Sequence, residues 1–360
     1  MTERRHRRKP PVRFEVLVAI LVALVAGVAW GVARGGDDDA AGERASSTAP
    51  TSSAHSTGAP TASPEVTPSS SASPSDPRRA LVIHGTGDVS LDPDYIPALR
   101  TNGYNWAWSG LDGLFERDDL TIINHECPST DIVAPVPKEF SFRCDPDALR
   151  AAKHAGVDVA NLANNHQYDQ GPDGLVDSIR NVEEAGLIAI GAGMNAEDAD
   201  APRYVDVKGW HIGLVGVDEV LDPETMVATG DEPGTAVGHD FPRALAAIRQ
   251  ADASADLVIV VIHWGVELDT QPRDYQIDEA HRMIDAGADM IFGHHAHRLQ
   301  PMDAYHGRPI FYGLGNFVWP NFSSEGSTTA VAEVHVSPEG DLTGKLLPAY
   351  IVSPGHPVLR

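Results

Sequence analysis

The sequence predicts a mixed α/β domain, and three observations carry this prediction. Short runs of Val, Ile and Leu recur along the chain, segments with helical spacing separate them, and an alternating apolar–polar pattern comes near the end. Nearly continuous apolar runs are typical of strands covered on both faces, and the alternation is typical of an antiparallel hairpin. The hairpin and the strand count favour a layered sandwich. A TIM barrel is the alternative, because eight strand-like runs also fit that fold.

The individual elements follow from these patterns. Eight apolar runs predict strands, at Ala80–Gly85, Leu120–Asn124, Val157–Leu162, Ile188–Gly191, His211–Val217, Leu257–His263, Met290–Gly293 and Ile310–Gly313. Four segments with helical spacing or a helix-start signal predict helices, at Asp145–His154, Asp173–Ala185, Asp240–Ala251 and Tyr275–Ala286. The alternating segment Thr329–Val352 predicts the hairpin, with its turn at Pro338.

The N-terminal part predicts a membrane anchor. Val16 to Ala33 is an apolar run of 18 residues without a charge, about the minimum length that crosses the hydrocarbon core of a bilayer. Basic residues precede the run and Asp37 to Asp39 follow it. The positive-inside rule therefore predicts a cytoplasmic tail at 1–13, a transmembrane signal-anchor at 14–34 and an extracytoplasmic remainder. We expect a single-pass protein of the cell membrane; a cleaved signal peptide is the alternative.

Ser, Thr, Ala and Pro dominate residues 35–78, which hold almost no large apolar side chain. Such a segment buries too little surface to offset the entropy cost of ordering, so we expect a disordered linker. The folded domain is then expected at 79–353, a length that fits one large domain or two small ones.

Charge and cysteine content narrow the classes of partner and site. The formal net charge is −24, from 27 Lys and Arg against 51 Asp and Glu. An acidic surface repels nucleic acid, so no nucleic-acid partner is expected. The two cysteines, Cys127 and Cys144, form no Cys-x-x-Cys pattern, which excludes a zinc knuckle or a thioredoxin-like site. Outside the cytoplasm they can form a disulfide; two separate buried thiols are the alternative.

Side chains that can bind metal ions follow five of the expected strands. In open α/β sheets, sites form outside the carboxyl ends of strands, so residues far apart in the sequence can meet there. Imidazole nitrogens and carboxylate oxygens bind divalent transition metals, and one bridging carboxylate holds two ions about 3.5–4 Å apart. Each residue alone fits an ordinary turn or surface role, but their recurrence favours a metal site. The residues are Asp88, Glu126, Asn164, Asn165, His166, His263, His294, His295 and His297.

Six motifs stand in the order in which they occur in a known family. They are Gly87-Asp88-Val89-Ser90, Asn124-His125-Glu126-Cys127-Pro128, Asn161 to His166 with Asp169 and Gly171, His263-Trp264-Gly265-Val266-Glu267, Gly293 to His297, and Tyr312 to Phe317. On these motifs the sequence from 80 to 352 resembles the CapA family of capsule or poly-γ-glutamate synthesis proteins. That family is similar to the calcineurin-like metallophosphatases. The resemblance implies a four-layer α/β-β-α sandwich around two divalent metal ions (Mn, Zn or Fe).

The resemblance also implies roles for single residues. The implied metal ligands are Asp88, Glu126 as the bridging carboxylate, Asn165, His166, His263, His295 and His297. His166, oriented by Asp169, is the implied catalytic acid; the alternative is that Asp169 only caps a turn. Glu267, His294 and Asn316 are accessory candidates, and His294 is the weaker ligand because only His295 and His297 keep the one-residue gap of the family pair.

Two positions depart from the metallophosphatase pattern. Ser90 stands where the first motif, Asp-x-His, has its His, and the bridging residue Glu126 stands in place of Asp. One of the two metal sites is therefore expected to have fewer ligands. Glu267 and Asp92 are candidates for the missing ligand.

Three functions follow as hypotheses. The first is a membrane-anchored, extracytoplasmic, metal-dependent hydrolase of a phosphoester or amide bond in capsule, poly-γ-glutamate or other envelope-polymer biosynthesis. The alternative is a non-catalytic scaffold or export component of a polymer synthase complex. The third is binding of an anionic envelope polymer, which an acidic domain repels unless metal or basic residues offset the charge. Lys138, Arg143 and Arg298 lie near the motifs, although solvent exposure is the ordinary role for each.

Overall fold

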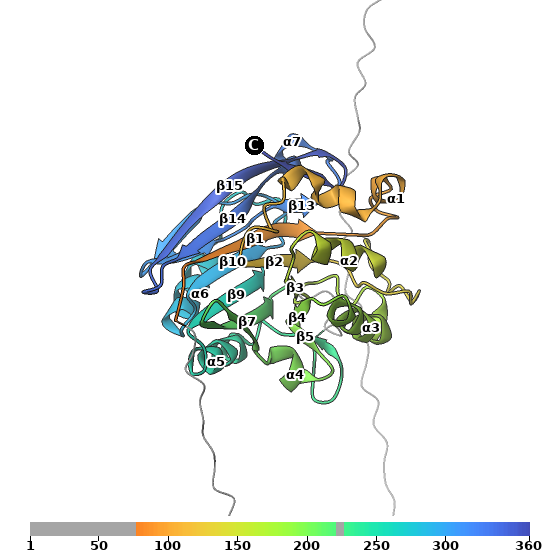
Figure 1. The fold of residues 1–360 in the computed structure, drawn as a ribbon. Coiled ribbons are helices and arrows are strands. Elements are labelled where there is room, and N and C mark those ends of the chain that lie inside the picture. The colour runs from red at the N-terminus through yellow and green to blue at the C-terminus, as the bar shows by residue number, and fades with distance from the viewer. Residues whose placement is uncertain (1–76, 221–226) are drawn as a thin grey trace, which may run out of the picture. The chain divides into compact units, whose positions relative to one another are not determined.

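The computed structural model describes residues 77–220 and 227–360, which lie in one compact unit (Figure 1). The predicted anchor at 14–34 and nearly all of the predicted linker at 35–78 lie outside these residues. Within the two described ranges, no helix has both the length and the apolar composition needed to cross a bilayer. The described strands run from Leu81 to Leu359, past the expected domain end at 353.

The larger of the two main sheets combines N-terminal strands with the C-terminal hairpin. It contains β1 (Leu81–Val89), β2 (Leu120–His125), β3 (Val159–Asn161), β4 (Ile188–Ile190), β13 (Asn316–Val318), β14 (Thr328–Val336), β15 (Leu342–Ser353) and β16 (His356–Leu359). The order is β16-β15-β14-β1-β2-β3-β4, and β13 pairs with β1 off this path. The strands β1 to β4 are parallel, whereas β14, β15 and β16 pair antiparallel. In Figure 1 the hairpin β14–β15 forms the blue upper left of the domain.

The second sheet is built from the middle of the chain. It contains β6 (Arg203–Val207), β7 (Trp210–Asp218), β9 (Leu257–His263), β10 (Met290–His294), β11 (Met302–Tyr305) and β12 (Arg308–Phe311). The order is β11-β12-β10-β9-β7-β6, with β7, β9, β10 and β12 parallel. Two short strands, β5 (Ala192–Gly193) and β8 (Gly234–Thr235), pair with each other apart from this sheet.

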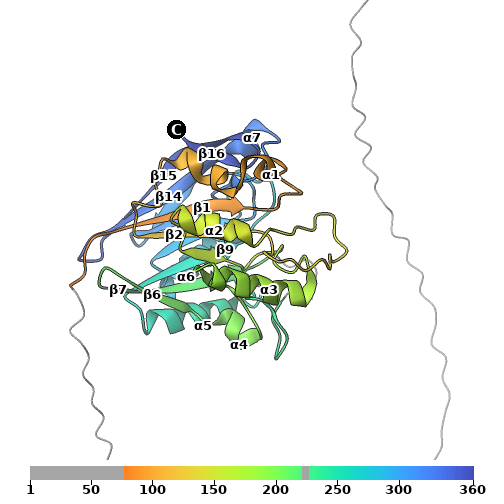
Figure 2. The same cartoon turned by 45° about the vertical axis from the view of Figure 1, so that its right-hand side comes forward.

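Helices cover the outer face of each sheet. The first sheet packs against α1 (Ala98–Asn102), the 3-10 helix η1 (Tyr104–Leu111), α2 (Asp147–His154) and α3 (Gly171–Glu184). The second sheet packs against α5 (Phe241–Asp252) and α6 (Asp274–Asp285). The short helices α4 (Ala196–Asp200) and α7 (Ser324–Ser327) lie at opposite ends of the view in Figure 2, where α2 and α3 stand in the foreground.

The two sheets bury their inner faces against each other. Ile83 and Ile122 of the first sheet share one apolar cluster with Ile259 and Phe292 of the second. The next residue along β2, Ile123, belongs instead to the cluster under the helices, as the two-residue period of a strand requires. The layers therefore run helix, sheet, sheet, helix. This arrangement confirms the predicted mixed α/β class and the layered sandwich, and the TIM-barrel alternative is wrong.

Each of the eight predicted strands and four predicted helices is present, with ends that differ by a few residues. The predicted hairpin corresponds to β14 and β15, which pair from Thr328 with Tyr350 to Val336 with Leu342. The sequence patterns did not indicate β5, β6, β8, β11, β13 or β16, nor the 3-10 helix η1.

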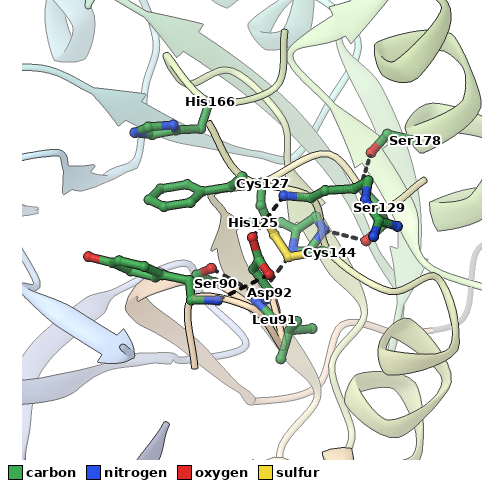
Figure 3. Close-up of a disulfide and its surroundings, with 12 residues drawn as sticks. Ser90, Leu91, Asp92, His125, Cys127, Ser129, Cys144, His166 and Ser178 are labelled. Carbon is green, nitrogen blue, oxygen red and sulfur yellow. Dashed lines mark hydrogen bonds between the residues drawn. A yellow bond between two sulfur atoms is a disulfide. The ribbon is translucent and has the colours of Figure 1, made fainter. Parts of the chain in front are cut away.

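A buried disulfide links two segments of the first sheet's helical side. Cys127, two residues past the end of β2, bonds to Cys144, with the Cα atoms 5.8 Å apart (Figure 3). The backbone N–H of Leu91 donates to the sulfur of Cys144 at 3.0 Å. The bond therefore ties the end of β2 to the segment that precedes α2. The structure has the disulfide and not the alternative of two separate thiols.

Candidate metal centre

The carboxyl ends of strands from both sheets meet at one buried group. Asp88 lies near the end of β1, Glu126 directly follows β2, and His263 ends β9. All three side chains are fully buried, and one candidate ligand atom from each lies within 4.8 Å of the others. Next to Asp88, Gly87 lets β1 pack closely against the backbone of Gly315, because a Cβ at Gly87 would meet the carbonyl oxygen of Gly315 at 2.1 Å. These three side chains form a group that could bind a metal ion.

Glu126 carries the strongest indication of a cation. Neither of its carboxylate oxygens meets a hydrogen-bond donor among the described residues, although both are buried. Burial and the nearby charge of Asp88 raise the pKa of Glu126 well above its ordinary value. Buried polar atoms without partners are costly, and a buried carboxylate is normally paired or bound to metal. The residues present therefore fit a bound divalent ion, whose positive charge would satisfy both oxygens.

His295 and His297 face this group from the loop that follows β10. The ring of His295 lies 4.8 Å from the ring of His263, and His297 Nδ1 lies 3.1 Å from Asp88 Oδ2 and 2.8 Å from Asn316 Oδ1. Burial lowers the pKa of His297, but the Asp88 carboxylate outweighs it and the pKa is raised. Burial lowers the pKa of His295 to about 4.

The same two histidines hold unusual backbone conformations. Their φ angles are 83° for His295 and 51° for His297, in the left-handed region that residues other than glycine seldom adopt. Strain of this kind concentrates where the surrounding fold fixes side chains for a function. The loop therefore presents both imidazoles at a conformational cost.

His166 lies beside the group on the loop after β3. Its Nδ1 lies 2.7 Å from Asp169 Oδ2, and its ring packs on Phe142 at 4.3 Å between centroids. Asp169 Oδ2 also accepts a hydrogen bond from the Phe142 backbone N–H at 2.7 Å. Burial lowers the pKa of His166, although the hydrogen bond and charge of Asp169 act in the opposite direction. Asp169 thus orients His166 and also fixes the loop around Phe142. Both contacts that the sequence suggested for Asp169, with the imidazole and with a turn, are therefore present.

Asn165 and Asn124 hold His263 from its two sides. Asn165 Oδ1 lies 3.0 Å from His263 Nε2, and Asn124 Nδ2 lies 3.2 Å from His263 Nδ1. Asn124 also donates to Asp88 Oδ1 at 2.9 Å, and its own Oδ1 accepts from Asn161 and Asn164. Asn124 is the connecting residue that the sequence analysis did not single out. The signal was available, because Asn124 is a polar residue at the end of the apolar run of β2 and stands within a quoted motif.

Lys138 has a different role from the one that sequence reasoning gave it. Its ammonium group lies 2.8 Å from Asp169 Oδ1 and donates to the Asn165 carbonyl oxygen at 2.8 Å, and its side chain is nearly buried. Solvent exposure, the ordinary role expected for it, is therefore wrong. Arg143 is partly buried as well and donates to the Thr130 carbonyl oxygen.

The accessory candidates differ in what their side chains contact. His294 Nε2 lies 2.9 Å from the carbonyl oxygen of Thr86, although its Nδ1 has no hydrogen-bond partner among the described residues. Asn316 accepts from His297 and so positions that ring. Glu267 lines the cavity beside the centre. Asp92 accepts backbone N–H groups of Asp94 and Arg143, so its carboxylate holds a turn.

A second group of metal-capable atoms lies nearby, formed by His125, Cys127 and Cys144. Both sulfurs are in the disulfide, so neither is a thiolate that could bind metal. His125 Nε2 lies 2.8 Å from Ser129 Oγ, and burial lowers its pKa to about 4. With the disulfide formed, this group therefore has a structural role and is not a metal site.

Solved structures resemble the chain loosely. The NAD nucleotidase of Haemophilus influenzae aligns over 76% of this chain and 51% of its own, with a TM-score of 0.49 and 14% identity. A hypothetical protein of Thermus thermophilus aligns over 74% of this chain and 99% of its own, with a TM-score of 0.46 and 16% identity.

Sequence relatives are much nearer. The capsule biosynthesis protein CapA of Bacillus anthracis is 36% identical over 273 residues, which cover 74% of this chain and 66% of the relative. The PGA biosynthesis protein CapA of Bacillus subtilis is 31% identical over 257 residues, 71% of this chain and 67% of the relative. A probable polyglutamine synthesis accessory protein of Mycobacterium tuberculosis is 32% identical over 240 residues, 61% of this chain and 63% of the relative.

The chain thus spans about two thirds of the length of the relatives that it matches. The model of the family described as bacterial capsule synthesis protein PGA_cap matches residues 82–321, which include every residue of the metal-capable group. The chain therefore belongs to the PGA_cap family and is a homologue of the CapA capsule and polyglutamate biosynthesis proteins.

Proposed function

We propose that this protein is a metal-dependent hydrolase that cleaves a phosphoester or amide bond in an envelope polymer. One observation carries the proposal: Asp88, Glu126 and His263 converge, fully buried, and both oxygens of Glu126 lack a donor within the described residues. A buried carboxylate with two free oxygens is suited to bridge two ions. In the proposed ligand set, Asn165, His295 and His297 join these three residues.

The chemistry divides between the ions and the protein. Divalent ions held by this set supply Lewis acidity to a phosphoryl or carbonyl oxygen. Asp169 accepts the Nδ1–H of His166, which leaves Nε2 as the nitrogen that exchanges a proton with substrate. Lys138 fixes the other oxygen of Asp169, so the carboxylate cannot turn away from the imidazole. His166 is thus the proposed acid–base residue, and its role as a ligand is the alternative.

The setting of the reaction is also a proposal. Relatives named for capsule, PGA and polyglutamine synthesis support an anionic envelope polymer, or its synthase complex, as the partner. The apolar run from Val16 to Ala33 supports attachment to the cell membrane, and the disulfide supports an oxidising, extracytoplasmic location for the domain.

The test measures metal and rate together. The full-length protein is assayed for bound Mn, Zn and Fe by mass spectrometry, and for hydrolysis of a phosphodiester and of a γ-glutamyl amide. We expect bound metal and activity in the wild type, loss of both in Glu126→Ala, and recovery of wild-type activity after chelation and metal return. Glu325→Ala, an exposed acidic residue of α7, is the control and keeps both. Wild-type metal content and rate in Glu126→Ala and His263→Ala would refute the assigned site.

A non-catalytic role in polymer assembly is the second candidate. The relatives are named for synthesis or as accessory proteins, and none of these names describes a hydrolase. A strain that lacks the gene is complemented with wild type or with His263→Ala, and surface polymer is measured. Full polymer with the metal-site variant would favour the scaffold role, and loss of polymer with both the deletion and this variant would favour the catalytic one.

A further inference from the structure

A cavity of about 390 Å³ lies directly against the candidate metal centre. His166, His297 and Asn316 form part of its wall, so the metal-site side chains and the cavity share one surface. Any group that occupies the cavity must be joined to, or lie next to, the atoms that react at the metal centre. The remaining wall therefore determines which substrates fit.

Aromatic residues are the largest group in that remaining wall, namely Tyr95, Phe140, Phe142, Trp319 and Phe322. Tyr95 lies 4.6 Å from Phe142 and 5.6 Å from Trp319 between ring centroids, and Trp319 lies 4.8 Å from the ring of His297. The cluster therefore reaches the metal centre without a gap. Such rings offer flat faces with a negative quadrupole, which attract the weakly positive C–H groups of a ring laid against them.

The rim of the cavity exposes apolar side chains to water. Phe322 is 78% exposed, Leu268 is 59% exposed and Phe140 is 52% exposed, and all three line the cavity. They come from three separate loops, after β13, after β9 and before α2. A contiguous exposed apolar patch on a soluble domain commonly marks a binding surface. The patch continues the aromatic wall outward from the cavity.

The charged groups of the cavity are few and opposite in sign. Glu267 supplies one carboxylate and Arg298 one guanidinium, and Arg298 already donates to the His297 carbonyl oxygen at 2.7 Å. A γ-linked glutamate chain carries a carboxylate on every residue, and within the cavity wall itself, apart from any bound metal, one partly committed Arg beside a Glu cannot offset that charge. A neutral ring with hydroxyl groups can donate to Glu267 and accept from Arg298 while its face stacks on the aromatic wall.

We propose that this cavity is a subsite for a neutral sugar ring next to the bond that the metal centre cleaves. The position of that bond rests on the proposed hydrolase function, whereas binding of the sugar does not. Trp319 and Tyr95 form the stacking surface, Phe322 extends it at the rim, and Glu267 and Arg298 recognise hydroxyl groups. The substrate class is a polymer that carries a neutral sugar next to the phosphoester or amide bond that is cut.

Calorimetric titration tests the subsite apart from catalysis. Full-length protein in detergent is stripped of metal by chelation, so that no hydrolysis disturbs the measurement. It is titrated with neutral tetramers of glucose and of N-acetylglucosamine, and with a tetramer of γ-linked glutamate. We expect saturable binding of at least one neutral tetramer. Trp319→Ala should weaken it by roughly 2- to 10-fold, the range for loss of one aromatic contact.

Two further variants keep the test independent of folding. Phe322→Ala changes an exposed side chain and should weaken binding without a change in melting temperature, whereas Val352→Ala, an exposed residue of β15 outside the cavity wall, should bind as wild type. Glu126→Gln should lose hydrolysis and keep sugar binding. Sugar binding without any hydrolase activity would therefore refute the proposed function and leave the subsite standing.

Three results would overturn the subsite. The first is no saturable binding of either neutral tetramer to the wild type. The second is unchanged affinity in both Trp319→Ala and Phe322→Ala. The third is binding of the glutamate tetramer with the same dependence on these two residues, which would make the cavity a site for the acidic chain.

Discussion

At the scale of single residues, Asn124 determines the geometry of the candidate metal centre. It donates to Asp88 and to His263, which belong to different sheets, and it accepts from Asn161 and Asn164. Every polar atom of its amide is therefore used. Mutation of a residue that orients a metal ligand in this way typically lowers the affinity for the metal.

We expect Asn124→Ala to weaken metal binding by roughly 10- to 100-fold while the protein still folds. Without the amide, the Asp88 carboxylate and the His263 ring lose the donor that fixes their orientation. A competition titration with a metal-binding dye measures the affinity. Asn181→Ala is the matched control, because Asn181 is a hydrogen-bonded amide on α3 that contacts no candidate ligand. Equal affinities for the two variants would contradict the role of Asn124.

Sequence reasoning identified the members of the site better than their arrangement. Asp88, Glu126 and His263 were predictable because ligands follow apolar strands, and strand ends converge. Asn124 was missed and Lys138 was assigned to the surface, because their roles depend on partners elsewhere in the chain, His263 and Asp169, which no local pattern indicates. The assignment of single residues as ligands stays a prediction until metal is measured.

At the scale of elements, β14 stabilises the first sheet through one buried carboxylate. Glu333 lies between β1 and β15, opposite His84 on one side and Lys345 on the other. Its Oε1 lies 2.7 Å from Lys345 Nζ and 2.6 Å from His335 Nε2, and its Oε2 lies 3.2 Å from His84 Nε2. Burial raises the pKa of Glu333, but these hydrogen bonds outweigh it and lower the pKa to about 2.

A depressed pKa gives a stability that depends on pH with a definite sign. The charged form of Glu333 stabilises the fold above the ordinary glutamate pKa of 4.5, and this stability is lost as the pH falls through the folded-state value of about 2. At pH 7 we expect Glu333→Gln to lower the free energy of unfolding by roughly 1–2 kcal/mol after solvent screening. Urea unfolding from pH 7 to pH 3 should show the difference shrinking.

The exposed Glu339, in the turn of the same hairpin, provides the control for that series. Glu339→Gln should unfold as wild type at each pH. A Glu333→Gln deficit that stayed constant down to pH 3 would assign the effect to lost packing instead of charge.

Elements that lie within a continuous apolar run were predictable and those without one were not, for a physical reason. β9 is seven consecutive apolar or ligand residues, all buried, and such a run has few other interpretations. β5 and β8 have two residues each, too few to show any period, and they form because the chain around them is already fixed. β13 depends on the approach of Asn316 to Asp88 in β1, a contact far along the chain.

At the scale of the whole molecule, each sheet supplies only part of the centre. Asp88 and Glu126 come from the first sheet and His263, His295 and His297 from the second, so the group exists only where the two sheets pack. Which strands share a sheet is not written in local patterns. The resemblance to a known family implied the layered sandwich but did not assign strands to sheets, and residues 14–34 and most of 35–78 lie outside what the structure tests.

The disulfide stabilises the fold next to the candidate metal centre. It ties residue 127, next to Glu126, to Cys144, two residues from Phe142, which packs on His166. A bond that closes a loop of sequence separation 17 contributes about 3 kcal/mol by limiting the unfolded chain. We expect the double variant Cys127→Ala, Cys144→Ala to melt roughly 5–10 °C lower than wild type.

The disulfide should also protect residues 131–143, the loop next to the candidate metal centre, from proteolysis. Without it, residues 131–143 lose one covalent attachment, so limited proteolysis should cut this segment faster in the double variant. Reductant should reproduce both effects in the wild type and change nothing in the variant, which serves as its own control. If wild type and variant melt within one degree of each other, then hydrogen bonds such as that from Phe142 to Asp169, and not the disulfide, hold the loop in place.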